Sequence, residues 1–258
     1  MRICIIGAGK MGGFLADALC FQHEVAVFDR DIRRLQYVFN IRRLVSLDEV
    51  RDFDPELLIN AVTLKYTLQT FDELMPYIGK DCIISDIASV KTGFKEYYEK
   101  CGHRYVSTHP MFGPTFANLR ELRKNHAIII TEGDYLGKVF FKDFYGSLGL
   151  NLHEYSFQGH DETIAYSLSI PFVSTMAFAA CMKHQDAPGT TFQKHFEVAQ
   201  GVLSEDDFLL SEILFNPYTP EQVENIIKQM TALLDIIKER DSEKMKKFLT
   251  SLRENIKG

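Results

Sequence analysis

Three glycines near the N-terminus, Gly7, Gly9 and Gly12, constrain the fold of this chain more than any other feature. They follow a short β-branched run at 3–6 and precede a stretch with helical periodicity at 11–21. In such a context the first glycine permits a tight turn, the second lets the backbone approach a bound anion, and the third lets the helix pack closely on the strand. The spacing therefore predicts a strand, a glycine turn and a helix whose N-terminus faces a phosphate group.

The rest of the first 156 residues alternates short β-branched runs with helical patterns. Strands are predicted at 3–6, 25–28, 57–62, 82–85, 104–108 and 127–131. Helices are predicted at 11–21, 64–77, 92–100 and 135–148. This alternation indicates an α/β fold with a doubly wound, mostly parallel sheet of the Rossmann type. From 157 to 258 only long helical patterns follow, so we expect a nucleotide-binding domain at 1–156 and an all-helical domain at 157–258.

Charge and composition exclude several classes of partner. The chain has 35 acidic and 29 basic residues and a formal net charge of -6, so no general positive field attracts nucleic acid. Its five cysteines are scattered without the spacing of a metal site, which predicts reduced thiols in a cytoplasmic protein and no bound metal. The segment 163–182 contains no charged residue, but its serines, threonines and Pro171 favour a helix buried in protein over a membrane span.

An acidic side chain stands where the second strand of a nucleotide-binding domain would end. Asp29 lies 22 positions after Gly7, where a carboxylate can accept hydrogen bonds from a ribose 2'-hydroxyl and repel a 2'-phosphate. This favours NAD as the cofactor, although the neighbouring Arg30 could accommodate the phosphate of NADP. A glycine turn with a purely structural role is the alternative. The residues expected at the cofactor are Gly7, Gly9, Lys10, Met11, Gly12, Asp29, Arg30, Val62 and Asp86.

Two polar segments follow predicted strands and are candidates for the proton-handling groups that a nicotinamide reaction needs. The segment DIASVK occupies 86–91, and the segment HPMFGPT occupies 109–115. Proline and glycine beside His109 fix an irregular backbone there, as expected for a residue at the exit of a strand. The alternative is that His109 only fills a loop, since most histidines have no catalytic role.

Together with the glycine motif, these two segments resemble those of prephenate dehydrogenases of tyrosine biosynthesis. The pair His160 and Asp161 at the start of a long helix extends the resemblance into the helical part. The resemblance implies an NAD-dependent oxidative decarboxylation of prephenate to 4-hydroxyphenylpyruvate. In that reaction His109 would be the catalytic base at the ring 4-hydroxyl, and Ser89 would help to orient it. The helical domain would also bind the small-molecule substrate. Its nearly uncharged segment 163–182 suggests an intertwined homodimer, which burial inside one monomer could also explain.

The chain departs from the family pattern at three places. Many members carry an acidic residue where this chain has Thr115, and a SerHisxProHis run where it reads LSIPF at 168–172. The arginine that binds the side-chain carboxylate of the substrate has no obvious counterpart, and Lys194 lies closest to its place. We therefore expect Lys194, His160 and Thr115 at the substrate, and arogenate stays open as an alternative to prephenate. His160 and Asp161 could also form a helix N-terminal box without a role in the site.

Two further classes of protein share parts of this pattern. Another two-domain dehydrogenase, acting on a hydroxy acid or an imino acid, would have the glycine motif and the helical tail without needing Ser89 and His109 at these positions. An NAD-sensing binding protein would bind nucleotide without turnover. It would ordinarily carry a basic DNA-binding segment, which this sequence lacks.

Overall fold

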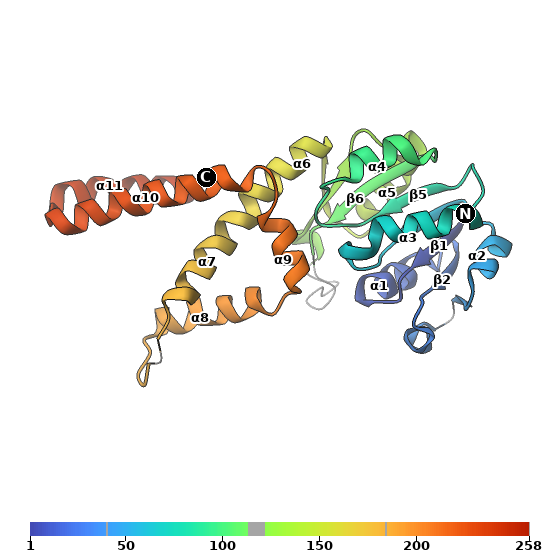
Figure 1. Cartoon of the computed structure of the whole chain (residues 1–258), viewed down its shortest axis with the longest axis horizontal. Coiled ribbons are helices and arrows are strands. Elements are labelled where there is room, and N and C mark those ends of the chain that lie inside the picture. The colour runs from blue at the N-terminus through green and yellow to red at the C-terminus, as the bar shows by residue number, and fades with distance from the viewer. Residues whose placement is uncertain (40, 113–121, 184, 258) are drawn as a thin grey trace. The chain divides into compact units, whose positions relative to one another are not determined.

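The computed structural model describes residues 1–39, 41–112, 122–183 and 185–257. The chain forms two compact units, Met1–Asp161 and Glu162–Gly258. The first unit holds a β-sheet with helices on both faces, and the second unit is helical (Figure 1). The expected fold class, a Rossmann-type sheet followed by a helical part, is confirmed.

The described strands form one sheet in the order β3-β2-β1-β4-β5-β6-β7-β8. Their bounds are β1 Arg2–Ile6, β2 Glu24–Phe28, β3 Arg42–Leu44, β4 Leu57–Asn60, β5 Ile83–Asp86, β6 Tyr105–Pro110, β7 His126–Ile130 and β8 Asn151–Tyr155. Strands β1 to β6 pair in parallel, β7 pairs antiparallel to β6, and β8 pairs parallel to β7. Because the order reverses between β1 and β4, their carboxyl ends form the crevice where ligands bind in such sheets.

Helices cover both faces of this sheet. The helices of the first unit are α1 Lys10–Leu19, η1 Ile32–Tyr37, α2 Leu47–Phe53, η2 Leu64–Tyr66, α3 Thr67–Leu74, η3 Met75–Tyr77, α4 Phe94–Cys101, η4 Leu122–Lys124 and α5 Tyr135–Ser147. On one face α1 and α5 pack against the side of β1 that carries Ile3 and Ile5. On the other face α2, α3 and α4 pack against the side that carries Cys4 and Ile6. Burial of both sides explains why the strand sequences are continuous apolar runs.

Five elements of the first unit are missing from the sequence-based prediction: β3, α2, β8 and the short 3-10 helices η1 and η4. β3 has only three residues, which is too short for a recognisable alternation. β8 reads NLHEY and lies at the edge of the sheet, where its polar side chains reach solvent and hide the pattern of a strand. Strand β6 is longer than predicted and includes His109, because the backbone of His109 pairs with Ile128 of β7.

The boundary between the two units falls inside α6, because the first unit ends at Asp161 and the second begins at Glu162. From this boundary onward the described elements are the end of α6 Phe157–Ile164, the π-helical turn η5 Ala165–Ser169, α7 Ile170–Cys181, α8 Thr190–Leu203, α9 Asp207–Leu214, α10 Thr219–Glu239 and α11 Ser242–Lys257. A buried polar contact joins η5 to α10, where the hydroxyl oxygens of Ser169 and Thr219 lie 2.7 Å apart. The carbonyl oxygen of Ile213 in α9 lies 3.4 Å from the hydroxyl oxygen of Ser169 and 3.2 Å from that of Thr219. The hydroxyl that accepts within the pair can donate to this carbonyl, so the contact joins three elements.

The uncharged segment 163–182 is less buried than expected. By length and composition the helical run Phe157–Cys181 could cross a membrane, and 17% of its most apolar part is buried within the structure. No residue of α7 is fully buried. The expectation that this segment is buried on all sides is therefore wrong within a single chain, because α7 keeps an apolar surface that the described residues do not cover.

Candidate active site

The glycine turn after β1 has the geometry that nucleotide binding needs. Gly7 has φ of +101°, and a Cβ there would lie 3.0 Å from the carbonyl oxygen of Ala61. A Cβ on Gly12 would overlap the carbonyl oxygen of Gly7. At Gly9, by contrast, a Cβ would meet no atom of the described residues within 4 Å. The turn therefore leaves open space beside the first amides of α1, and these amides have no side-chain cap at Gly9 and suit a phosphate.

A cavity of about 400 Å³ lies beside this turn, at the carboxyl ends of β1, β2 and β4. Five of the residues expected at the cofactor line it: Gly7, Gly9, Asp29, Arg30 and Val62. The other four, Lys10, Met11, Gly12 and Asp86, are not among its lining residues. Its position at the reversal of strand order is the usual place for the adenosine half of a dinucleotide.

Asp29 is fixed against the glycine turn at the end of β2. Its side chain is 11% exposed, and its Oδ2 accepts a hydrogen bond of 2.7 Å from the backbone N–H of Ala8. Its Oδ1 accepts a bond of 2.8 Å from the backbone N–H of Asp31. Each carboxylate oxygen can accept more than one hydrogen bond, so Asp29 keeps the capacity to bind a ribose hydroxyl.

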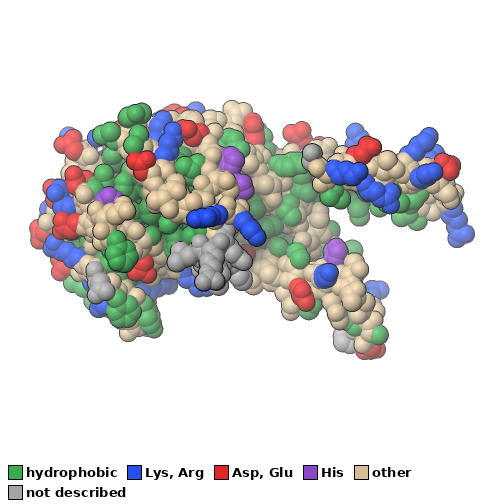
Figure 2. Space-filling model, turned by 180° about the vertical axis from the view of Figure 1, so that it is seen from behind, with side chains coloured by type: hydrophobic (Ala, Val, Ile, Leu, Met, Phe, Trp, Pro, Cys, Tyr) green, Lys and Arg blue, Asp and Glu red, His purple; other side chains and the backbone are tan. Residues whose placement is uncertain are grey.

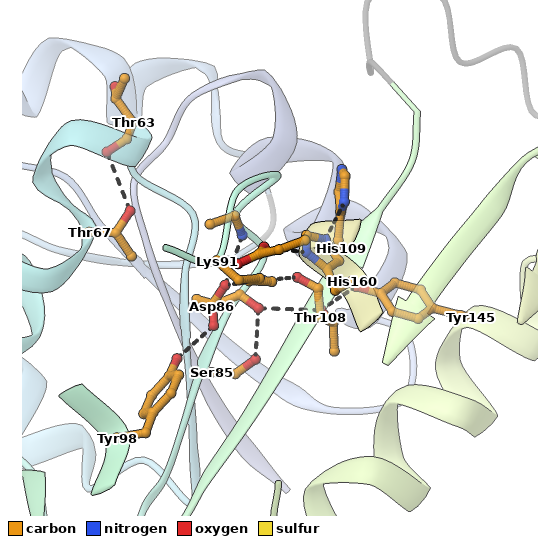
Figure 3. Close-up of polar contacts among 12 residues, drawn as sticks. Thr63, Thr67, Ser85, Asp86, Lys91, Tyr98, Thr108, His109, Tyr145 and His160 are labelled. Carbon is orange, nitrogen blue, oxygen red and sulfur yellow. Dashed lines mark hydrogen bonds and ion pairs between the residues drawn. The ribbon is translucent and has the colours of Figure 1, made fainter. Parts of the chain in front are cut away.

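A fully buried ion pair lies between β5 and β6 (Figure 3). The Nζ of Lys91 is 2.5 Å from Oδ1 of Asp86, and both side chains are 0% exposed. Lys91 also donates to the carbonyl oxygen of Thr108 at 2.8 Å, and the hydroxyl of Tyr98 donates to Oδ2 of Asp86 at 2.6 Å. Burial lowers the pKa of Lys91, and the charge of Asp86 opposes this change. Both carboxylate oxygens of Asp86 therefore accept hydrogen bonds, one from Lys91 and one from Tyr98. Through Lys91 the carboxylate links the ends of β5 and β6.

His109 lies at the carboxyl end of β6 and belongs to a series of three polar side chains joined by hydrogen bonds. Its Nδ1 is 3.1 Å from Nε2 of His160, which is fully buried on α6 (Figure 3). The Nδ1 of His160 is in turn 3.1 Å from Oδ1 of Asp161. A carboxylate only accepts hydrogen bonds, so the series is satisfied when His160 donates to Asp161 and His109 donates to His160. This assignment places the proton of neutral His109 on Nδ1 and makes Nε2 the nitrogen that can accept a proton.

The surroundings keep both histidines neutral. Burial, assisted by His160 and by the charge of Lys91, holds the pKa of His109 well below its ordinary value. Burial and the charge of Lys91 also lower the pKa of His160. Burial raises the pKa of Asp161 to about 6, against the opposing hydrogen bond and charge of Lys91, so its carboxyl is mainly ionised at neutral pH. His109 is therefore an unprotonated imidazole at neutral pH, which is the form that a general base requires.

The other predicted residues, Ser89, Lys194 and Thr115, are not members of this group of three bonded side chains. Ser89 is half-buried in the segment between β5 and α4, and no side-chain hydrogen bond joins it to His109 among the described residues. Lys194 is exposed on α8 in the helical unit. Thr115 lies outside the described residues.

Sequence reasoning missed Lys91 and Asp161 as parts of the site. Lys91 follows Asp86 by five residues in a segment that leaves a predicted strand, and this opposite-charge pair at a strand exit was an available signal. The sequence predicts Asp161 only as the neighbour of His160 at the start of a helix. The roles of both depend on contacts that cross the fold, since the Nζ of Lys91 binds the backbone just before His109.

Comparisons with known proteins agree with this geometry. Residues 20–147 match the family model of the prephenate dehydrogenase nucleotide-binding domain. A probable arogenate/prephenate dehydrogenase of Methanocaldococcus jannaschii is 23% identical over 210 residues, which are 75% of this chain and 46% of that protein. The T-protein of Haemophilus influenzae is 23% identical over 180 residues, 68% of this chain and 44% of that protein. The chain thus spans less than half the length of these curated relatives.

Solved structures show the same fold over nearly the whole chain. A prephenate dehydrogenase from Aquifex aeolicus, in complex with hydroxyphenyl propionate and NAD+, has a TM-score of 0.85 at 17% identity and covers 99% of this chain and 96% of that one. The arogenate dehydrogenase of Synechocystis has a TM-score of 0.80 at 16% identity and covers 100% and 99%. At these identities the structures establish the fold, and the family model covers residues 20–147, which follow the glycine turn. The family model over residues 20–147, together with these relatives and structures, supports assignment of the chain to the prephenate dehydrogenase family.

Proposed function

We propose that this protein catalyses the NAD-dependent oxidative decarboxylation of prephenate to 4-hydroxyphenylpyruvate. The observation that carries the proposal is the chain from His109 through His160 to Asp161, which holds a neutral imidazole at the exit of β6. Because β1 and β6 run in the same direction, that exit lies at the same edge of the sheet as the glycine turn. A base and a nucleotide site at one edge are what a dehydrogenase of this kind needs.

The nucleotide is NAD, and when bound it supplies the hydride acceptor. The Nε2 of His109 takes the proton of the ring 4-hydroxyl while the carbon that bears this hydroxyl gives up its hydride. The resulting carbonyl draws the electrons of the ring carboxylate bond, carbon dioxide leaves, and the ring becomes aromatic. The charge that develops on His109 is stabilised through His160 by the carboxylate of Asp161. General base catalysis of this kind contributes about 10²- to 10⁴-fold to the rate.

The structure favours a changed role for one predicted substrate contact. His160 is fully buried and bonded to His109, so we assign it to positioning the base and not to the substrate. Ser89 is proposed to orient the substrate hydroxyl next to His109. Lys194 is proposed to bind the side-chain carboxylate, since it is an exposed cation on α8. A lysine supplies charge without the bidentate fork of an arginine, so it leaves prephenate and arogenate less sharply distinguished.

The helical unit is proposed to form a homodimer. Besides α7, its long helices expose large apolar side chains, which gather along the extended helices in Figure 2. They include Ile227, Met230, Leu234 and Ile237 on α10, with Leu249, Leu252 and Ile256 on α11. A contiguous apolar surface of this kind marks an interaction site more often than a free surface. Light scattering of the purified protein tests the proposal, and a monomer at micromolar concentration would refute it. The enzyme is proposed to act in the cytoplasm.

The experiment that tests the function is NADH formation with prephenate and, separately, with arogenate. We expect turnover of prephenate and a fall in kcat of about 10²-fold or more in His109→Asn, with NAD affinity unchanged. The matched control is His153→Asn, since His153 lies on the edge strand β8 and contacts only His126 among the described histidines. Turnover of arogenate alone would identify arogenate, and not prephenate, as the substrate. Absence of turnover with both compounds, or a His109→Asn variant as active as the control, would overturn the proposal.

A further inference from the structure

Five charged side chains line the cavity beside the glycine turn, and most of them are held by partners. Asp29 binds backbone N–H groups, as described above. Asp31 accepts two hydrogen bonds from the guanidinium of Arg33, a residue that is not part of the cavity lining. Arg34 lies with its Nη1 4.0 Å from Oδ2 of Asp29. The remaining two, Arg30 and Glu73, form an ion pair with each other.

This ion pair joins two elements that are far apart in the sequence. Arg30 follows β2 directly after Asp29, whereas Glu73 lies near the end of α3, and both line the same cavity. Glu73 is also held by its own helix, since its Oε1 accepts a hydrogen bond of 2.8 Å from the side-chain amide of Gln69. The carboxylate is therefore placed beside the guanidinium of Arg30 by the helix that carries it.

The pair contributes little to folding. The side chains of Arg30 and Glu73 are 57% and 38% exposed, and ion pairs with such exposure stabilise a protein by about 0–1 kcal/mol. Its effect on the cavity is larger, because it decides whether the guanidinium of Arg30 is available there, whereas the guanidinium of Arg34 lies beside Asp29. An arginine at the place of Arg30 is the group that accommodates the 2'-phosphate of NADP in this fold. Guanidinium groups bind phosphate through two parallel hydrogen bonds, and a carboxylate already bound to the guanidinium competes for them.

We propose that Glu73 selects NAD over NADP together with Asp29, by occupying the guanidinium of Arg30. Asp29 accepts from the ribose hydroxyls and repels a 2'-phosphate from one side. Glu73 neutralises the cation that would otherwise bind that phosphate from the other side. The inference concerns the nucleotide alone, so it stands whichever substrate the enzyme oxidises.

Nucleotide binding to the full chain, measured by titration calorimetry with NAD+ and NADP+, tests this proposal without turnover. Glu73→Gln removes the charge and keeps the size of the side chain. We expect the Kd for NADP+ to fall by about two- to fivefold and the Kd for NAD+ to change by less than about twofold, with the gain shrinking as salt rises. Combined with Asp29→Ser, the same change should lower the Kd for NADP+ further, because the second repulsive carboxylate is then absent.

Two further variants identify the cause. Asp72→Asn is the matched control, since Asp72 is the neighbour of Glu73 on α3 but binds the hydroxyl of Tyr97 and does not line the cavity. It should leave both affinities unchanged. The double variant Glu73→Gln with Arg30→Met should return the Kd for NADP+ to the wild-type value. An unchanged Kd for NADP+ in Glu73→Gln overturns the proposal, and so does tight NADP+ binding that persists without Arg30.

Discussion

Replacing His160 with leucine tests the central contact of the site. Leucine fills similar space on α6 but offers no acceptor for the Nδ1 proton of His109, whose side chain is buried. Glutamine at the same position keeps an acceptor, because its carbonyl oxygen can take this hydrogen bond. The two variants therefore differ in whether the productive tautomer of His109 has a partner.

The size of the effect follows from the burial of the donor. A buried N–H without an acceptor costs about 1–3 kcal/mol. In the leucine variant this cost falls only on the tautomer whose Nε2 can accept a proton, so His109 shifts to the other tautomer. At about 1.4 kcal/mol for each tenfold change in rate, kcat should fall by about 5- to 150-fold. In the glutamine variant most of this loss should be absent.

Activity alone would not separate positioning from a loss of structure, so a second measurement is needed. Nitrogen-15 NMR of labelled histidines reports which ring nitrogen of His109 carries the proton. We expect Nδ1 in the wild type and in His160→Gln, and Nε2 or a mixture in His160→Leu, while NAD affinity and the melting temperature serve as controls for folding. A leucine variant with wild-type kcat, or a wild-type His109 protonated on Nε2, would refute the reasoning.

Two other predictions concern the buried charges. Lys91→Met should lower the free energy of unfolding by about 3–5 kcal/mol in urea denaturation, because it leaves the carboxylate of Asp86 buried and without its ion-pair partner. Adding Asp86→Asn should recover most of this loss. A loss below about 1 kcal/mol would mean that water reaches the pair. The pH profile of kcat/KM should decline in two steps as the pH falls: a partial decline near pH 6, where the carboxyl of Asp161 takes up a proton, and a complete one at lower pH, where the pH falls through the depressed pKa of His109. A decline centred at or above pH 6.5 would show that His109 is not held in this neutral form.

The sequence predicts the local parts of this structure well and the contacts between distant segments poorly. The positive φ of Gly7 and the approach of Gly12 to Gly7 depend on the backbone of one strand and the helix that follows it, so their spacing alone identifies them. The contact between His109 and His160 joins residues 51 positions apart and depends on how α6 packs against β6. The resemblance to a family supplied both residues, but only the structure shows that the second binds the first. The same holds for Glu73, whose partner Arg30 lies on a different element.

The buried pair of Asp86 and Lys91 also limits how this sequence can change over generations. If the lysine is replaced first, the protein passes through a form with a buried anion; if the aspartate is replaced first, it passes through one with a buried cation. Either intermediate is less stable than both the starting and the final protein, so selection acts against each single step. Substitutions at these two positions should therefore occur together, and a relative with a neutral residue at one of them should have a neutral residue at the other.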